Sequence, residues 1–570
     1  MTIAYRRIML AAVSMAALST NVGTNVGAAL AAANGKPQTL AGHPRKGANL
    51  LSTLADPAPV GKPTTRLGRA YSGTPIDVTT YHYDNYRTGW NQAETDLTPA
   101  TVASAKFGLL QTLAVDGNVF AEPLLVSNFV MPDGSKHDVL IVVTGHNSVY
   151  AFDAQTYATL WQVNLGKSQS TNHVGCDDVK PEYGISSTPI ILRSAANAAT
   201  LYVVAGTEPN PYEFHTQLHA LNMATGADAQ TPVEIAPSAT LSDGSTLQFN
   251  AQNQWSRAGL AYNKGSLYVA IGSHCDNNAY GISGWLLRYK TTNLALQHAF
   301  HTIETPHGYE LASIWMSGFA PAIDAAGNVF VVTGNGDFTG GARDWGESVL
   351  RLGPGLNAVL DKFTPSNYGI LNNNDTDFGS GGVMLLPPAA GQVAPPMAVA
   401  MGKASLSYLL NQTNLGGLKA NDAGALQSYY VGGYGLWGGP AYYNGPAGPT
   451  VYAQTTGDVL HAASVATASA TPTLTPFAAG TTGAGYGGST PIVSSNGATA
   501  NTGVVWVMRR STPIQLEAYN AVTLGAPIYA ANAGSWSNPA HNNPFLTPLQ
   551  ANGRVYVPAY KTVTVFGLAP

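Results

Sequence analysis

An apolar strand recurs eight times along this chain after about Phe107. Each copy is rich in valine, leucine, tyrosine and alanine, and the copies repeat with a period of roughly sixty residues. They read VLIVVTG, TLYVVAG, SLYVAIG, NVFVVTG, PMAVAMG, TVYAQTTG, GVVWVMR and RVYVPAY. A repeat of this length indicates a structure in which each unit buries its apolar faces against its neighbours.

Two further strands flank each copy. The strand before it reads EPLLV, STPII, AGLAY, APAID, GGVML, GPAYY, STPIV or LTPLQ, and the strand after it reads like VYAFDA or LHALNM. Units of three or four short strands packed radially are propeller blades. We therefore predict an all-β fold, an eight-bladed β-propeller with four-stranded antiparallel blades. The last unit ends on its third strand, VTVFGL, so we expect Phe107 to Val115 to complete the final blade.

The N-terminal region has a different composition from the repeats. Arg6 and Arg7 precede the apolar stretch Ile8 to Leu18 and then small residues, which is the pattern of a secretory signal peptide. The stretch is too short to cross a bilayer core of about 30 Å as a helix. We predict a signal peptide over 1–31, a flexible low-complexity linker over 32–76 and the propeller over 77–570. The mature protein is then periplasmic or secreted, without a membrane span.

Charge and motifs exclude several functions. Charged residues make up 10% of the chain and the net charge is -4, without a basic block, so nothing favours nucleic acid as a partner. No GxxxxGK[ST] loop and no GxSxG elbow occurs, which argues against phosphoryl transfer and α/β-hydrolase chemistry. Propeller geometry places the loops after the second strands and the loops between blades on one face, and most polar candidates lie in those loops.

The repeats also resemble a known family. YAFDAQTYATLW, residues 150–161, is similar to the tryptophan-docking repeat AxDxxTGxxxW of pyrroloquinoline quinone (PQQ) dehydrogenases and PQQ-like propellers. The resemblance covers roughly residues 107–570. It implies the eight-bladed PQQ-like (quinoprotein alcohol dehydrogenase-like) fold, which serves dehydrogenases and also assembly-scaffold lipoproteins.

Four segments resemble site motifs of the quinoprotein alcohol dehydrogenases. VTGNGDF resembles GTGNGxPW and implies that Asn335 is a calcium ligand, and the loop of VVAGTEPNP implies the same of Glu208. NDTDFGSGG resembles HDxWDxxG, which makes Asp377 the general base and a metal ligand, with Asp375 as its companion. GKASLSYLLNQ resembles xRNGxxYxLDR and implies that Lys403 binds the quinone oxygens. The resemblance therefore implies PQQ and calcium as cofactors.

Two features depart from that family. Its adjacent cysteines, CCD, are replaced here by Gly175-Cys176-Asp177, and its stacked tryptophan aligns with Gly318 or Phe319, so the nearest candidate is Trp315. Cys176 and Cys275 are the only cysteines, and an exported chain can join them in a disulfide. Alternatively, Cys275 holds a metal together with His274 and Asp276.

Three functions follow from these patterns. The first is a PQQ- and calcium-dependent dehydrogenase that oxidises an alcohol, sugar or polyol and passes electrons to an acceptor. The second is a non-catalytic propeller that binds a polysaccharide or protein through an aromatic segment. Within that segment, we expect Tyr442 and Tyr443 to belong to an inner strand of a blade. The third is a glycan-active hydrolase or lyase with paired carboxylates. The aromatic segment comprises Tyr429, Tyr430, Tyr434, Trp437, Tyr442 and Tyr443, and the carboxylates are Asp337, Asp344, Asp375 and Asp377.

Overall fold

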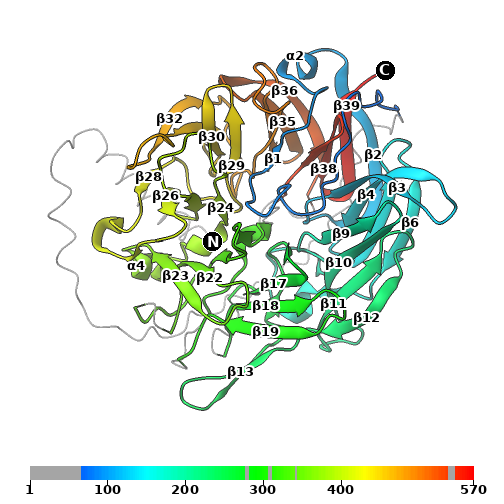
Figure 1. Ribbon diagram of the computed structural model, residues 1–570. Coiled ribbons are helices and arrows are strands. Elements are labelled where there is room, and N and C mark those ends of the chain that lie inside the picture. The colour runs from blue at the N-terminus through cyan, green and yellow to red at the C-terminus, as the bar shows by residue number, and fades with distance from the viewer. Residues whose placement is uncertain (1–65, 277–280, 306–310, 341–342, 537–545) are drawn as a thin grey trace. The chain divides into compact units, whose positions relative to one another are not determined.

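The first blade shows how each repeat folds. Strands β3 (Leu124–Val130), β4 (Lys136–Val143), β5 (Ser148–Asp153) and β6 (Thr159–Asn164) form one antiparallel sheet in that order. Every residue of β5 is buried, whereas β6 alternates between exposed and half-buried positions. The inner strands therefore lie between neighbouring blades, and the fourth strand forms the outer edge (Figure 1).

Seven more sheets follow the same order, so the chain is an eight-bladed β-propeller, as predicted. The computed structural model describes residues 66–276, 281–305, 311–340, 343–536 and 546–570. The remaining blades are β9 (Ile190–Ala195), β10 (Ala198–Thr207), β11 (His215–Asn222) and β12 (Asp228–Glu234); β16 (Ala261–Asn263), β17 (Ser266–Ser273), β18 (Trp285–Lys290) and β19 (Leu296–His301); β20 (Ala322–Ile323), β21 (Val329–Val332), β22 (Val349–Leu352) and β23 (Val359–Thr364); β24 (Val383–Leu385), β25 (Met397–Met401), β26 (Leu406–Asn411) and β28 (Gln427–Tyr430); β29 (Ala441–Gly445), β30 (Gly448–Ala453), β31 (His461–Val465) and β32 (Leu474–Ala479); β33 (Ile492–Ser494), β34 (Val504–Arg509), β35 (Ile514–Asn520) and β36 (Leu524–Gly534); and β37 (Leu549–Ala551), β38 (Arg554–Pro558), β39 (Tyr560–Leu568) and β2 (Phe107–Asn118).

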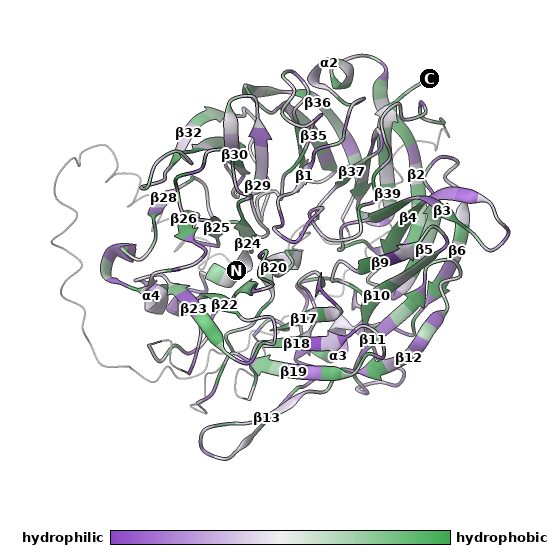
Figure 2. Cartoon of the chain, in the orientation of Figure 1, coloured by the Kyte–Doolittle hydropathy of each residue, from purple (hydrophilic) through white to green (hydrophobic). Residues whose placement is uncertain are grey.

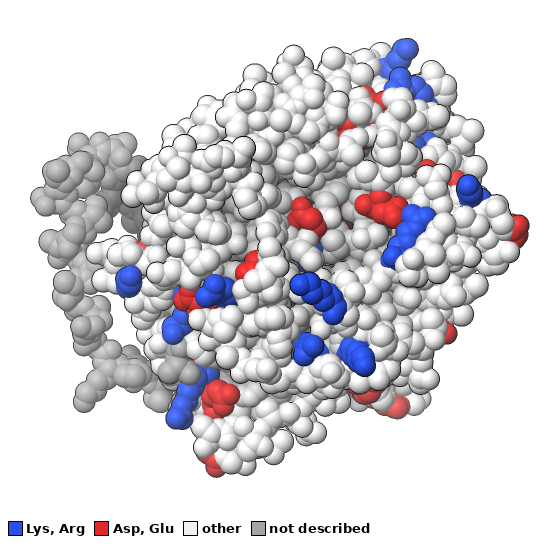
Figure 3. Space-filling model, viewed as in Figure 1, with Lys and Arg blue, Asp and Glu red and all other residues white. Residues whose placement is uncertain are grey.

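The remaining elements are short and decorate the blades. Hydrophobic residues dominate the inner strands, and hydrophilic residues lie on outer strands and in the connections (Figure 2), while Lys, Arg, Asp and Glu are scattered over the face shown in Figure 3. These elements are β1 (Trp90–Asn91), α2 (Pro99–Val102), β7 (Gln169–Ser170), α3 (Thr171–Val174), β8 (Glu182–Tyr183), β13 (Ser238–Thr240), β14 (Thr246–Gln248), β15 (Gln254–Trp255), η1 (Met316–Gly318), α4 (Tyr368–Asn373), η2 (Phe378–Ser380), β27 (Gly417–Leu418) and η3 (Ala420–Asp422). Among the described residues, no helix has the length and apolar character needed to cross a membrane.

The predicted closure of the ring is confirmed. Strand β2 pairs antiparallel with β39, with Phe107 opposite Leu568 and Ala114 opposite Thr562. It continues to Asn118, three residues beyond the predicted Val115. The final blade thus combines the N-terminal strand with the three C-terminal strands, so β2 covers the edge that β39 would otherwise expose.

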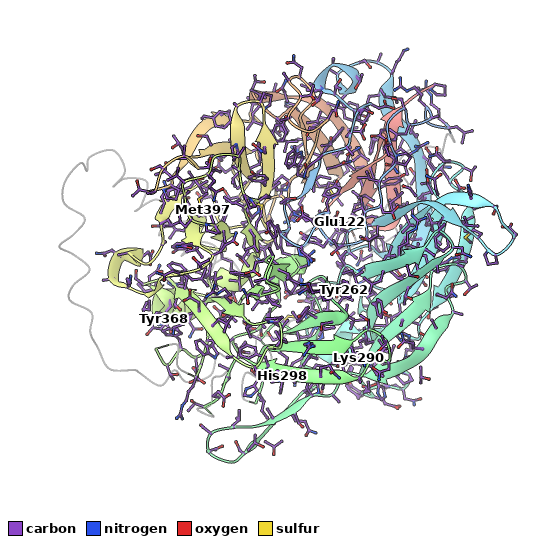
Figure 4. The ribbon with its side chains drawn as sticks, in the orientation of Figure 1. Glu122, Tyr262, Lys290, His298, Tyr368 and Met397 are labelled. Atoms are coloured by element: carbon purple, nitrogen blue, oxygen red, sulfur yellow. A yellow bond between two sulfur atoms is a disulfide. The ribbon has the colours of Figure 1, made fainter. Side chains whose placement is uncertain are left out.

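A segment before β2, which the repeat did not predict, runs along the inner strands. We call residues 78–91 the inner segment. It hydrogen-bonds to all eight blades in turn, through Leu125, Ile191, Tyr262, Ile323, Leu385, Tyr442, Val493 and Gln550. Figure 1 shows this blue segment inside the ring, and Figure 4 shows Glu122 and Tyr262 near the middle, with Lys290, His298 and Tyr368 farther out.

Arg87 anchors the inner segment. Its side chain is fully buried, and its guanidinium donates hydrogen bonds to the carbonyl oxygens of Pro321, Tyr81 and Asp84 and to the Thr80 hydroxyl. Burial lowers the pKa of Arg87 to about 10, so the group stays charged at neutral pH. The segment therefore brings a buried, hydrogen-bonded guanidinium to the inner strands, together with the buried rings of Tyr81 and Trp90.

Residues 66–76 belong to the interval for which we expected a flexible linker. Their backbone hydrogen-bonds to the final blade, because the Arg66 N–H donates to Leu110 O and the Arg69 N–H donates to Leu568 O. The expected signal peptide, residues 1–31, lies outside the described residues.

Candidate active site

The candidate site forms where β21 ends. Strand β21 is entirely buried, and it leads through Thr333 into Gly334 and Asn335. A Cβ at Gly334 would lie 2.5 Å from Asp377 Oδ1 and 2.8 Å from Trp315 Nε1, which no real side chain tolerates. Only glycine at this position lets Asp377 and Trp315 approach the backbone that carries Asn335.

Four of the residues singled out by the sequence form one hydrogen-bonded cluster. The Asn335 N–H donates to Asp377 Oδ1 at 2.9 Å, and Asn335 Nδ2 donates to Asp375 Oδ1 at 2.9 Å. Lys403 Nζ binds Asp375 Oδ1 at 2.9 Å and also binds Asp377 Oδ2. The side chain of Asp377 is 4% exposed, whereas that of Asp375 is 74% exposed. Asp377 is thus the buried acid of the cluster and Asp375 is its exposed neighbour.

Lys403 sets the charge of Asp377. Burial is the largest single influence and would raise the pKa of Asp377, but the Lys403 charge and the hydrogen bonds from Lys403 and the Asn335 N–H together hold it below its usual value. The two carboxylates in turn raise the pKa of Lys403 above its ordinary value, although burial opposes this. At neutral pH the cluster therefore contains the Lys403 ammonium beside the Asp377 carboxylate, while burial raises the pKa of Asp375.

A third carboxylate completes an oxygen-rich group. Carboxylate oxygens of Asp276, Asp375 and Asp377 lie within 4.8 Å of one another. Burial and then the Asp377 charge raise the pKa of Asp276 to about 7. Asn335 Oδ1 is buried and has no hydrogen-bond partner among the described residues. Three carboxylates and a bare amide oxygen are donors of the kind that Ca²⁺ takes.

Two cations lie over the indole ring of Trp315. Lys403 Nζ is 5.7 Å from the ring centroid and Arg257 Cζ is 5.6 Å from it. Burial lowers the pKa of Arg257 to about 10, against the charge of Asp178, so the group remains cationic. Trp315 replaces the aligned positions Gly318 and Phe319 as the aromatic ring of the site.

Cys176 and Cys275 form a disulfide, and Cys275 directly precedes Asp276 of the carboxylate group. The bond joins the loop before blade 2 to the loop after β17, with the two Cα atoms 5.7 Å apart. The Tyr183 hydroxyl donates to Cys176 Sγ at 2.8 Å. The bonded sulfur of Cys275 is no longer available as a thiolate, and His274 packs against Trp255. The alternative metal centre of His274, Cys275 and Asp276 is therefore wrong.

Glu208 belongs to a different network. Its carboxylate accepts the N–H groups of Ser170 and Tyr212, each at 2.8 Å, and also binds His173 Nδ1. Burial raises the pKa of Glu208, but these hydrogen bonds outweigh it and lower the pKa below its usual value. Within the described ranges, no acid group close enough to share a metal ion includes Glu208.

The remaining carboxylates proposed for hydrolysis, Asp344 and Asp337, make contacts that hold the local loops. Asp344 is buried and its Oδ1 accepts the N–H groups of Glu304 and Thr305, so it holds a loop in place. The carbonyl oxygen of Asp337 accepts the Gly346 N–H, which closes the turn after Asn335.

Sequence reasoning missed several neighbours of the cluster. Asp276 was assigned only to the alternative metal centre, and Arg257 stands in QWSRAG, which matches no motif. Trp437, 5.8 Å from Lys403 Nζ, was grouped with an aromatic segment and not with the site. The one available signal was the position of Asp276 in the loop after a second strand, on the same face as Asn335 and Lys403.

Solved structures share this architecture. The quinohemoprotein alcohol dehydrogenase from Comamonas testosteroni is 14% identical, with a TM-score of 0.52, and the match covers 86% of this chain and 80% of that one. A europium-containing methanol dehydrogenase is 12% identical, with a TM-score of 0.52, over 85% of this chain and 89% of that one. The fold is the one these dehydrogenases share.

A quinohemoprotein alcohol dehydrogenase from Pseudomonas putida HK5 gives a similar result. It is 12% identical, with a TM-score of 0.51, over 86% of this chain and 80% of that one. No family model matches this chain, and no curated protein does. The eight-bladed propeller fold is thus shared with these dehydrogenases, while the low identity establishes no activity.

Proposed function

We propose that this propeller is a PQQ- and calcium-dependent oxidoreductase that acts on a hydroxyl group. The observation that carries the proposal is the buried Asn335 Oδ1, which has no partner among the described residues although the rest of Asn335 hydrogen-bonds to Asp375 and Asp377 of the three-carboxylate group. An unsatisfied buried oxygen costs about 1–3 kcal/mol, and a bound cation would satisfy it. Asp276 takes the ligand position for which we expected Glu208.

The residues around Trp315 fit the quinone. PQQ is planar and carries three carboxylates, so it requires an aromatic face and cationic partners. Trp315 offers the face, and Arg257 and Lys403 lie over it. Cys275 directly precedes Asp276, so the Cys176–Cys275 disulfide lies next to the proposed site. It would take the part that the adjacent cysteines play in the quinoprotein alcohol dehydrogenases, which is to cover one side of the cofactor.

The cofactors and the side chains of the cluster would have separate parts in the oxidation of a hydroxyl group. When bound, PQQ supplies the acceptor for the hydride and its two electrons, and calcium polarises the reacting carbonyl. Asp377 takes the hydroxyl proton at Oδ2, the oxygen that Lys403 contacts here. Asn335 holds Asp377 through the hydrogen bond to Oδ1, so the carboxylate keeps one orientation. A Lys403 that bound the quinone oxygens instead would leave Asp377 with less stabilisation as an anion, which would make Asp377 a stronger base.

The test uses the full chain with PQQ and Ca²⁺. We expect a change in cofactor absorbance and dye-linked oxidation of at least one member of a panel of alcohols, sugars and polyols. Asp377→Asn keeps an oxygen at the ligand position and, with PQQ and Ca²⁺ saturating, should lose at least a hundredfold in kcat, in line with general-base catalysis. Asp344→Asn, a buried acid outside the cluster, is the matched control. No cofactor binding by the wild type would refute the proposal.

We also propose that the protein is exported. The support is the signal-like pattern of residues 1–31 and a disulfide, which forms in oxidising compartments. Mass spectrometry of the protein from fractionated cells should find a mature N-terminus near residue 32 outside the cytoplasm. A full-length cytoplasmic protein with reduced cysteines would contradict this.

A further inference from the structure

Three exposed tyrosines stand together beside the candidate site. Tyr430, Tyr434 and Tyr486 are 60%, 61% and 54% exposed, and we call them the tyrosine rim. They come from the end of β28 and from the loops that precede β29 and β33. Tyr442 and Tyr443, from the same aromatic segment, are instead buried in β29. The structure therefore separates rim residues from core residues that the sequence had grouped.

The rim is continuous with the site. The ring of Trp437 lies 4.9 Å from that of Tyr486, and Lys403 Nζ is 5.8 Å from the Trp437 centroid. A Cβ at Gly435 would lie 2.8 Å from Lys403 O, so only glycine allows the loop that carries Tyr434 to rest on the Lys403 backbone. A molecule with one group at Asp377 can thus extend over Trp437 toward the rim.

Gly457, which has no side chain, lies between the segments that carry Tyr434 and Tyr486. A Cβ at Gly457 would lie 3.6 Å from the Tyr434 ring, and the Gly457 N–H donates to Ala484 O, two residues before Tyr486. The floor of this region is therefore backbone, and its walls are phenol rings. Such a surface offers flat apolar faces with hydroxyl groups at their edges, and burial together with the nearby Asp458 carboxylate raises the pKa of Tyr430.

We propose that the tyrosine rim is a saccharide subsite, so that the hydroxyl presented to Asp377 belongs to a sugar ring or a polyol. A pyranose has an apolar C–H face that packs on aromatic rings and hydroxyls that hydrogen-bond at the edges, which matches phenol walls on a backbone floor. A small alcohol fills only the space at Asp377 and leaves the rim uncovered. The assignment of the substrate class rests on the proposed oxidoreductase function, whereas the subsite itself does not.

The test measures saccharide binding to the full chain without PQQ. Saturation-transfer NMR with maltose, cellobiose, chitobiose and sorbitol should detect at least one of them bound. Tyr434→Ala combined with Tyr486→Ala should weaken that binding at least tenfold, while Tyr434→Phe, which keeps the ring, should change it less than threefold. Tyr212→Ala removes a tyrosine that is 67% exposed on blade 2 and should leave the affinity unchanged.

Two results overturn the subsite: no member of the panel binds, or the double variant binds as tightly as the wild type with an unchanged Tm. PQQ binding and oxidation of 1-butanol are measured on the same samples. Butanol oxidation without saccharide binding refutes the rim and keeps the oxidoreductase. Saccharide binding without PQQ binding refutes the oxidoreductase and the substrate assignment, and keeps the subsite.

Discussion

Replacing Lys403 by methionine removes the cation that holds Asp377 as an anion. The pair with the exposed Asp375 contributes at most about 1 kcal/mol. Asp377 is 4% exposed, and breaking a buried pair by removing one partner costs about 3–5 kcal/mol. We therefore expect Lys403→Met to lower the free energy of unfolding by about 3–5 kcal/mol at pH 7.

This loss corresponds to a measurable change in Tm. The entropy of unfolding is about 2 cal/mol/K per residue, which is about 1 kcal/mol/K for a propeller of about 500 residues. Calorimetry should thus show a Tm lower by about 3–5 °C. Lys136→Met, at an exposed position of β4, should change Tm by less than about 1 °C. Adding Asp377→Asn to Lys403→Met should recover part of the loss, because the buried charge is then absent.

The effect also depends on pH. Lys403 lowers the folded pKa of Asp377, so the pairing stabilises the protein above the unfolded pKa of about 3.9 and this stabilisation is lost as pH falls through the folded pKa. The difference in Tm between wild type and Lys403→Met should be larger at pH 7 than at pH 3. A difference below 1 °C at pH 7, or an equal loss in Lys136→Met, would refute the reasoning.

Three further predictions concern the ring. Arg87→Ala should lower Tm by more than about 3 °C, because hydrogen bonds from a charged group contribute about 1.5–3 kcal/mol each, while Arg66→Ala at an exposed position should have no measurable effect. Cys275→Ser opens a loop with a sequence separation of 99 and should lower the free energy of unfolding by about 4 kcal/mol; an unchanged Tm under oxidising conditions would show that the bond does not form. A chain that begins after Asn118 lacks β2 and should show no cooperative unfolding in calorimetry, so a sharp transition from that chain would contradict the closure.

The repeat predicted the blades because each strand carries its own burial pattern. NVFVVTG became β21, and VTVFGL became part of β39, whose missing neighbour was found in β2. The inner segment was missed because it has no repeat of its own. Its structure depends on hydrogen bonds to the edges of eight separate sheets, which exist only after the ring has closed.

The part of the site that lies in segments with recognisable local motifs could be predicted from the sequence. Asn335, Asp375, Asp377 and Lys403 lie in segments that resemble known motifs, and the structure brings them together. Asp276 and Arg257 join them from the neighbouring blade, and no spacing in the sequence encodes that contact. Glu208 stands in a similar loop, but the nearby N–H groups of Ser170 and Tyr212 satisfy its carboxylate locally.

Equilibrium dialysis of PQQ against the full chain, read by absorbance with Ca²⁺ or with EGTA, tests the account of the site most directly. We predict saturable binding of one PQQ per chain that requires Ca²⁺. Asn335→Ala, which removes the unpartnered oxygen, should weaken this binding at least tenfold, and Asp344→Asn should leave it unchanged. PQQ binding that is absent, or that is equal with EGTA and in Asn335→Ala, would contradict the proposal that these oxygens and Trp315 form a quinone and cation site.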